Sequence, residues 1–217
     1  MLVCDMCGNR GCGTEGSTAP HANCPMTDGA FFDEELEKYR LAENYSFYRT
    51  CTALEAKGYC EWPRAREVVE FCLSMGYRKI GLAFCNGLRS EARIMGNVLR
   101  EHGFEVCSVM CKTGGRPKES VGVPPEEKVK PNGFEVMCNP IAQAELLNRE
   151  GTEFNVVIGL CVGHDSLFYK YSQAMVTTLI AKDRVLAHNP AGALYCADTY
   201  FKKRLYGEGP KTPEGER

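Results

Sequence analysis

Cysteine is the residue type that stands out in this chain, and four cysteines form a spaced set near the N-terminus. The pattern is Cys4-x2-Cys7-x4-Cys12-x11-Cys24. A C-x-x-C loop directs both sulfurs toward one ion, and Gly8 permits the sharp turn that follows Cys7. Thiolates are preferred ligands of zinc and of iron–sulfur clusters. We therefore predict a metal site at these four cysteines.

The pattern leaves the identity of the metal open. The knuckle form of Cys4 and Cys7 favours zinc, whereas Cys24-Pro25 and the total of thirteen cysteines favour a [4Fe–4S] cluster. His21 could replace one cysteine, although a solvated loop histidine is the simpler interpretation. Residues 1–30 lack apolar periodicity, so an unstructured, reactive tail is the alternative to a metal site. Metal binding would order such a segment directly.

A second group of cysteines and histidines occurs where predicted strands end. Continuous apolar runs predict buried strands over residues 80–84, 104–110, 156–162 and 175–181. The carboxyl ends of parallel strands form one edge of an open sheet, and ligands bind in the crevice outside it. The residues that we expect at this edge are Cys85, Cys111, Cys138, Cys161, His164, Asp165 and His188.

Two kinds of chemistry fit such a crevice. The thiols and imidazoles could hold a second metal ion or cluster. Alternatively, Cys85 or Cys161 could act as a nucleophile, with His164 or His188 as the base and Asp165 orienting that base. Each cysteine also has a simpler explanation, because free cysteine is often buried in cores.

The crevice could also bind a cofactor or a small anion. The turn Asn86-Gly87-Leu88-Arg89 opens a predicted helix, so its free amides and the Arg89 side chain suit an anion. Cys111 and Cys138 are assigned to the same ligand-binding set. The turn lacks the glycine-rich fingerprint of dinucleotide sites and any P-loop pattern. We interpret Lys182-Asp183-Arg184 as a turn between two strands.

Helical segments alternate with the predicted strands. Their predicted extents are 33–58, 63–76, 87–103, 139–151 and, for a short one, 165–171. This alternation predicts an α/β fold, with a mostly parallel sheet flanked by helices in a flavodoxin-like or Rossmann-like layout. A small Cys-rich metal-binding module and two helices precede it. The expected divisions are residues 1–30, 31–207 and a flexible tail, 208–217.

Composition narrows the class of protein. The 217 residues are 44% hydrophobic and 25% charged, which excludes collagen, disorder and coiled coil. A net charge of −2 gives no global field for nucleic acid or an anionic membrane. No secretory signal opens the sequence, and its longest apolar run is far shorter than the roughly 20 residues of a membrane helix. We expect a cytosolic protein whose thiols stay reduced, from an anaerobic prokaryote.

Four blocks of the sequence carry a resemblance to a known family. They are Lys79-Ile-Gly-Leu-Ala-Phe-Cys-Asn-Gly-Leu88, Cys138-Asn-Pro-Ile-Ala-Gln-Ala-Glu145, Gly159-Leu-Cys-Val-Gly-His-Asp165 and Lys182-Asp-Arg-Val185 with His188-Asn-Pro190. The chain resembles an uncharacterised prokaryotic family of proteins labelled as metal-binding (domain-of-unknown-function family eighteen-forty-seven), found largely in anaerobic bacteria and archaea. The resemblance implies metal binding and no particular reaction. Its blocks include most of the expected sheet-edge residues, which strengthens the prediction of a site there.

The sequence therefore predicts a cytosolic zinc or iron–sulfur protein with a four-cysteine site and a Cys/His-lined crevice. The expected partners are a metal ion or cluster and a small anionic ligand or redox partner. Two alternatives remain: a redox or thiol-dependent enzyme that uses the crevice, and a small-anion binder whose zinc is purely structural.

Overall fold

The computed structural model describes residues 1–9, 11–19 and 21–207, and the chain divides into two compact units, Met1–Tyr59 and Cys60–Arg217. The division falls at Tyr59, although the composition of the sequence changes near residue 30. The predicted tail, residues 208–217, lies outside the described residues. Within the described ranges, no helix is both long enough and apolar enough to cross a membrane.

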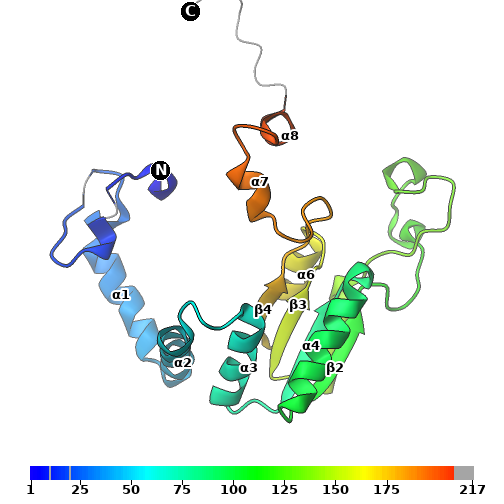
Figure 1. The fold of residues 1–217 in the computed structure, drawn as a ribbon, viewed down its shortest axis with the longest axis horizontal. Coiled ribbons are helices and arrows are strands. Elements are labelled where there is room, and N and C mark those ends of the chain that lie inside the picture. The colour runs from blue at the N-terminus through cyan, green and yellow to red at the C-terminus, as the bar shows by residue number, and fades with distance from the viewer. Residues whose placement is uncertain (10, 20, 208–217) are drawn as a thin grey trace, which may run out of the picture. The chain divides into compact units, whose positions relative to one another are not determined.

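The first unit consists of short 3-10 turns followed by two helices (Figure 1). The elements are η1 (Cys4–Met6), η2 (Gly11–Gly13), η3 (Pro25–Thr27), α1 (Gly29–Arg40) and α2 (Ala42–Gly58). Helix α1 begins before the predicted start at Asp33, because the Asp28 carboxylate accepts the Phe31 amide at 3.1 Å and caps the helix. The prediction of one continuous helix over 33–58 is wrong. Leu41 is extended, with ψ of 133°, and separates α1 from α2.

This first unit has almost no apolar core of its own. Among its described residues, Cys24 is the single buried apolar side chain, with 8% of its surface exposed. Large apolar side chains such as Phe31, Leu36 and Tyr39 lie on the surface. Ordering a backbone costs about 1–2 kcal/mol per residue in conformational entropy. Burial of one thiol does not offset that cost, so another interaction has to order the segment.

The second unit is built on a four-stranded, all-parallel sheet, which confirms the predicted α/β class. Its strands are β1 (Lys79–Phe84), β2 (Glu105–Met110), β3 (Phe154–Ile158) and β4 (Met175–Ile180), in the spatial order β2-β1-β3-β4. This is the order of the first four strands of flavodoxin-like sheets, in which the switch point lies between β1 and β3. The site of such folds forms at the carboxyl ends of these strands.

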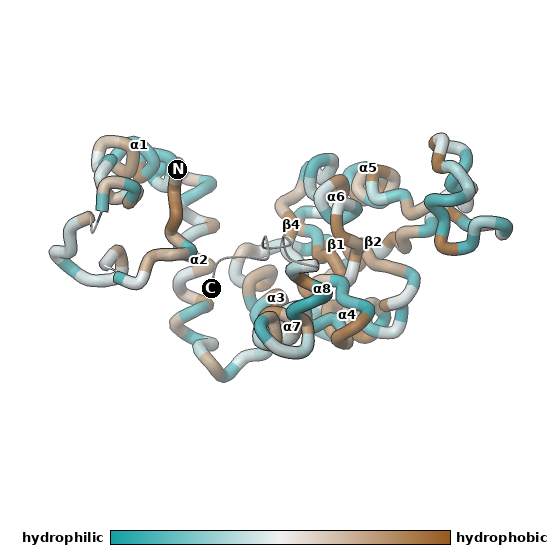
Figure 2. Tube along the Cα trace, turned by 90° about the horizontal axis from the view of Figure 1, so that it is seen from above, coloured by the Kyte–Doolittle hydropathy of each residue, from teal (hydrophilic) through white to brown (hydrophobic). Residues whose placement is uncertain are grey.

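Helices cover both faces of this sheet (Figures 1 and 2). Helices α3 (Arg64–Ser74) and α4 (Arg89–Glu101) lie on one face, and α5 (Pro140–Glu150) and α6 (His164–Tyr171) lie on the other. Two short helices, α7 (Ala191–Tyr195) and α8 (Lys202–Tyr206), follow β4. The core between the layers is apolar. Its fully buried side chains include Ile80, Leu82, Leu99, Leu147, Val156, Ile158 and Phe168.

Strand β3 ends earlier than the sequence predicts. The apolar run continues to Val162, but Gly159 has φ of +63°, which a residue with a side chain rarely adopts. A Cβ at Gly159 would also lie 2.6 Å from Cδ2 of Leu88, so the chain turns where Leu88 packs. Cys161 therefore lies in the loop between β3 and α6 and not within the strand.

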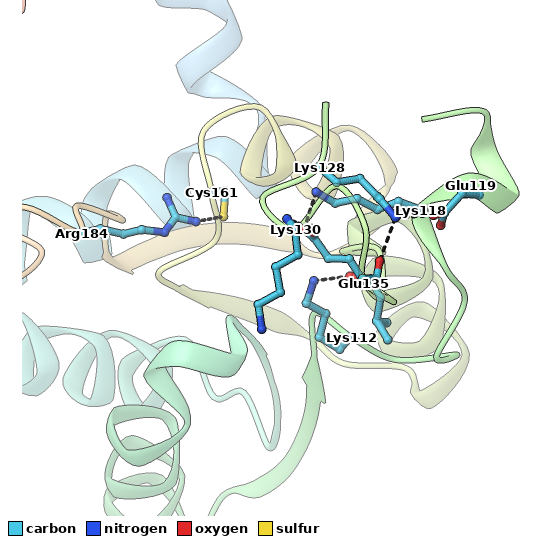
Figure 3. A network of polar contacts seen from close by, with 10 residues as sticks. Lys112, Lys118, Glu119, Lys128, Lys130, Glu135, Cys161 and Arg184 are labelled. Carbon is cyan, nitrogen blue, oxygen red and sulfur yellow. Dashed lines mark hydrogen bonds and ion pairs between the residues drawn. The ribbon is translucent and has the colours of Figure 1, made fainter. Parts of the chain in front are cut away.

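The segment between β2 and α5 is the predicted long excursion, and it holds two 3-10 turns, η5 (Lys118–Val121) and η6 (Pro125–Glu127). Figure 3 shows the ion pairs that fix it. Lys118 pairs with Glu135 at 2.6 Å, and the almost fully buried Lys128 ammonium pairs with Glu119 and donates to the Gly133 carbonyl. The Lys128 ammonium lowers the pKa of the Glu119 carboxyl. The excursion is thus a structured loop that returns the chain to Cys138.

Candidate functional site

All four parallel strands end at one edge of the sheet, and a cysteine or a lysine follows each of them within a few residues. Cys85 follows β1, Cys111 follows β2, Cys161 follows β3 and Lys182 follows β4. Cys85 and Cys111 come directly after Phe84 and Met110, which are register partners, so they are neighbours across the two strands. The Asn139 amide donates to the Cys111 carbonyl at 2.8 Å, which places Cys138 at the same edge.

Three of the predicted cysteines form one cluster, which we call the thiol row: Cys85, Cys111 and Cys138. Cys111 lies between the other two and is hydrogen-bonded to both. Cys85 is 9% exposed and Cys111 is 3% exposed, whereas Cys138 is half-buried. The Asn86 amide donates to Cys111 Sγ at 3.3 Å. The row thus has two enclosed sulfurs and one that solvent reaches.

The hydrogen bond from Cys111 makes Cys85 an acidic thiol. This bond lowers the pKa of Cys85 to about 4, against the opposing effect of burial. The Lys182 ammonium, whose Nζ lies 2.7 Å from Cys85 Sγ, and the Gly87 amide lower the pKa of Cys85 further. A Cβ on Gly87 would lie 3.5 Å from Lys182 Nζ and 3.9 Å from Cys85 Sγ. These are ordinary contact distances, and they show that the Gly87 backbone lies directly beside both groups.

Cys138 is acidic for a related reason. The hydrogen bond from Cys111 lowers the pKa of Cys138 to about 5, burial opposes this, and the charges of Lys112 and His164 reinforce it. Cys111 behaves in the opposite way, because its bonds to Cys138 and Cys85 raise the pKa of its own thiol. Cys111 has a single S–H, which donates to Cys85 or to Cys138 at any one moment, so the row has an acidic thiol on either side of one that keeps its proton.

Cys161 belongs to a separate pair. Its Sγ accepts a hydrogen bond from Arg184 Nη2 at 3.0 Å (Figure 3), and Cys161 is half-buried. Arg184 and Lys182 lie in a loop after β4. The prediction that Lys182-Asp183-Arg184 is a turn between two strands is wrong, because in the described residues no strand follows β4. The loop instead brings two cations to the sulfurs.

The remaining predicted residues take various positions at this edge. His164 begins α6, and its buried Nδ1 has no hydrogen-bond partner within the described part of the chain. Asp165 Oδ1 accepts the Ser166 amide, and His188 Nδ1 accepts the Asp183 amide at 3.1 Å. Arg89 is exposed at the first turn of α4. The roles of base, orienter and anion ligand that the sequence predicts for these residues stay predictions.

The sequence analysis missed the cations. Lys112 follows Cys111, and its ammonium donates to the Val136 carbonyl. Lys182 and Arg184 follow the last apolar strand within a few residues. A charged residue directly after a buried parallel strand was the available signal, because it is placed at the same edge as the cysteines. Interpreting Lys182-Asp183-Arg184 as a turn between two strands led us to overlook these cations.

The predicted N-terminal ligands also converge. Cys4, Cys7, Cys12 and Cys24 all line one cavity of about 330 Å³, together with His21 and with Phe32 of α1. Turns η1 and η3 shape it: the Cys7 amide donates to the Cys4 carbonyl at 3.2 Å, and the Thr27 amide donates to the Cys24 carbonyl at 3.1 Å. In the described part of the chain, no three His, Cys, Asp or Glu side chains are already positioned around one point as metal ligands.

Comparison with known proteins shows two similarities. The family model described as "Protein of unknown function (DUF1847)" matches residues 24–179. An uncharacterised protein of Methanocaldococcus jannaschii is 48% identical over 173 residues, which cover 80% of this chain and 87% of that protein. The matched family range includes the whole thiol row and Cys161. It begins at Cys24 and so leaves out the first three N-terminal cysteines.

Proposed function

We propose a metal-binding function for this chain, which belongs to the DUF1847 family of proteins of unknown function. Its N-terminal unit binds zinc or a [4Fe–4S] cluster through Cys4, Cys7, Cys12 and Cys24. The observation that carries the proposal is the single cavity that all four thiols line. Two separate features of the sequence, the knuckle at Cys4 and the distant Cys24, meet at this cavity.

The chemistry of this donor set fits a soft metal. Four thiolates suit zinc in tetrahedral geometry and also suit an iron–sulfur cluster. A cysteine side chain turns about one bond, so rotamer changes can redirect each of these sulfurs within the cavity. His21 lines the same cavity and is a fifth available donor. A bound metal would supply folding free energy to a unit in which Cys24 is the single buried apolar side chain among the described residues.

The thiol row is a poorer metal site, although its sulfurs could ligate a second metal or cluster. Lys182 already neutralises Cys85, Lys112 lies near Cys138, and Arg184 binds Cys161. These positive charges oppose the entry of a metal cation and stabilise thiolates without one. We therefore propose the metal site in the N-terminal unit. For the thiol row we propose chemistry of the sulfur atoms themselves, without a metal. All thirteen cysteines are free, which suits the reducing cytosol that we propose as the compartment.

Metal analysis on protein purified without oxygen tests the proposal. One equivalent of zinc in colourless protein, or four of iron with four sulfides in brown protein, is the expected result. Cys4→Ser and Cys24→Ser should each lose most of the metal. Cys51→Ser is the matched control, because Cys51 lies in the same unit on α2, outside the cavity, and should keep it.

Two results would count against this assignment. Protein that binds no stoichiometric metal under these conditions would refute it. Metal that survives Cys4→Ser and Cys24→Ser but is lost in Cys85→Ser would transfer the centre to the sheet edge and establish the second-metal alternative there.

A further inference from the structure

The thiol row has the geometry of an exchange site and not of three unrelated core cysteines. Cys85 and Cys111 follow register partners on adjacent parallel strands, which lie about 4.8 Å apart, within the span that a disulfide bridges. Cys111 is also in hydrogen-bond contact with Cys138. One central sulfur therefore has two neighbouring sulfurs within bonding reach.

Access and charge give the three sulfurs different roles. Cys138 is the one that solvent reaches, and it stands just before the N-cap of the eleven-residue helix α5, where backbone amides favour an anion. Cys111, nearly inaccessible, carries the proton. Cys85 is enclosed, and Lys182 holds it as an anion at 2.7 Å. The thiolate is the nucleophile in thiol–disulfide exchange, so attack starts at Cys138.

A cavity of about 500 Å³ adjoins the row. Its wall includes Met110 and Lys112, the residues on either side of Cys111, and Asn86, whose amide binds Cys111 Sγ. Lys130 contributes a second ammonium group from the excursion. The wall is completed by Val129, Phe134 and Val136, with Glu135, which is already paired with Lys118. Two cations beside an apolar wall suit a small organic molecule that carries carboxylates.

We propose that the thiol row reduces small, carboxylate-bearing disulfides, with Cys138 as the attacking sulfur and Cys111 as the resolving sulfur. This inference concerns a different part of the chain from the metal site and does not depend on it.

The exchange balances in two steps. The Cys138 thiolate attacks one sulfur of the substrate R–S–S–R, a mixed disulfide forms, and one RS⁻ leaves. Cys111 then gives its proton to the departing RS⁻ and attacks Cys138 Sγ, which releases the second half of the substrate as RS⁻ and forms the Cys111–Cys138 disulfide. Two electrons pass from the row to the substrate. One thiolate, that of Cys138, is consumed, and one RSH and one RS⁻ are produced, so charge is conserved, and a dithiol reductant resets the row.

Single-turnover exchange on the whole, reduced chain tests the proposal. Oxidised glutathione and cystine serve as probes, and the readouts are released thiol and peptide mapping of disulfides. We expect two thiols released per chain and a Cys111–Cys138 bond. Cys138→Ser should abolish release. Cys111→Ser should release one thiol and retain the other half of the probe on Cys138.

Matched variants separate the row from general thiol reactivity. Cys107→Ser, on β2 beside the row but outside it, should behave as the unchanged protein does. Lys130→Ala should raise the concentration of probe needed for half the maximal rate and leave the maximal rate unchanged. Hydroxyethyl disulfide, which has no carboxylate, should react about tenfold more slowly than cystine at equal concentration.

The outcomes distinguish this inference from the metal proposal. Cys4→Ser should lose metal and keep thiol release. If neither probe releases thiol from folded protein, or if Cys138→Ser releases it at the original rate, the exchange site is refuted whatever the metal content. Circular dichroism of each variant confirms that lost release reflects lost chemistry and not unfolding.

Discussion

Replacing Lys182 by methionine should shift the titration of Cys85 by about one pH unit. Lys182 Nζ lies 2.7 Å from Cys85 Sγ, and its ammonium helps the Cys111 hydrogen bond and the Gly87 amide to lower the pKa of Cys85 to about 4. A hydrogen bond to a charged group contributes about 1.5–3 kcal/mol. Because Lys182 is partly solvated, we halve this to about 0.8–1.5 kcal/mol, which is about 0.6–1.1 pKa units. We expect the pKa of Cys85 in Lys182→Met to be about 5.

The two pKa values of Cys85, about 4 before the substitution and about 5 after it, fix the direction of the change in its thiolate fraction and the pH range of that change. At pH 5 the thiolate fraction of Cys85 should fall from about nine-tenths to about half, and at pH 7 it should hardly change. Since the folded-state pKa lies below that of the unfolded thiol, the stabilisation is complete above the unfolded pKa and is lost as the pH falls through about 4. Lys182→Met reduces this stabilisation at neutral pH by the same roughly 1 kcal/mol.

The assay is the rate of iodoacetamide labelling at Cys85, followed by mass spectrometry of its peptide between pH 3.5 and 7. Arg184→Met is the control: Arg184 lies in the same loop but donates to Cys161, so the Cys85 profile should not move. A Lys182→Met midpoint that stays within 0.3 units of the original, or moves downward, would show that Lys182 does not hold Cys85 as an anion.

Three other predictions follow from the geometry. Gly159→Ala should destabilise the protein by about 2–4 kcal/mol in urea unfolding, since it forces a side chain to φ of +63° and against Leu88; a change below 1 kcal/mol would contradict the tight turn. Asn139→Ala should cost about 1 kcal/mol, because its Oδ1 accepts the Ala142 amide at 3.1 Å, and Asn139→Asp should restore most of it. If metal orders the first unit, chelation under reducing conditions should expose Cys24 to alkylation. Cys72, which is buried in α3, should stay protected and serves as the control. Equal protection of Cys24 with and without metal would contradict this prediction.

Local signals in the sequence were sufficient for much of the fold. Asn139-Pro140 predicted a cap and a first-turn proline, and the structure shows the cap bond at the start of α5 and Gly151 with positive φ at its end. Apolar runs placed all four strands. The spatial order β2-β1-β3-β4 could not be read, because strand pairing depends on contacts between residues far apart in the sequence.

The sequence predicted which cysteines lie together at the sheet edge, but it did not predict the lysine and arginine side chains beside them. That Cys85, Cys111 and Cys138 would meet followed from topology, since parallel strands end on one edge. Cys161 lies outside the thiol row because the chain turns at Gly159, before it reaches Cys161. The path of Lys182 across the edge is set by the loop after β4, which has no periodicity to reveal its direction.

The thiol row has an odd number of members, and this limits how far oxidation can proceed inside it. One internal bond takes up two of the sulfurs and always leaves the third unpaired. Because Cys111 is central, the leftover sulfur is either Cys85 or Cys138, and each adjoins a bonded sulfur that it can attack. The oxidised form therefore retains an internal nucleophile, and the bond can migrate from one side of Cys111 to the other without any outside reagent.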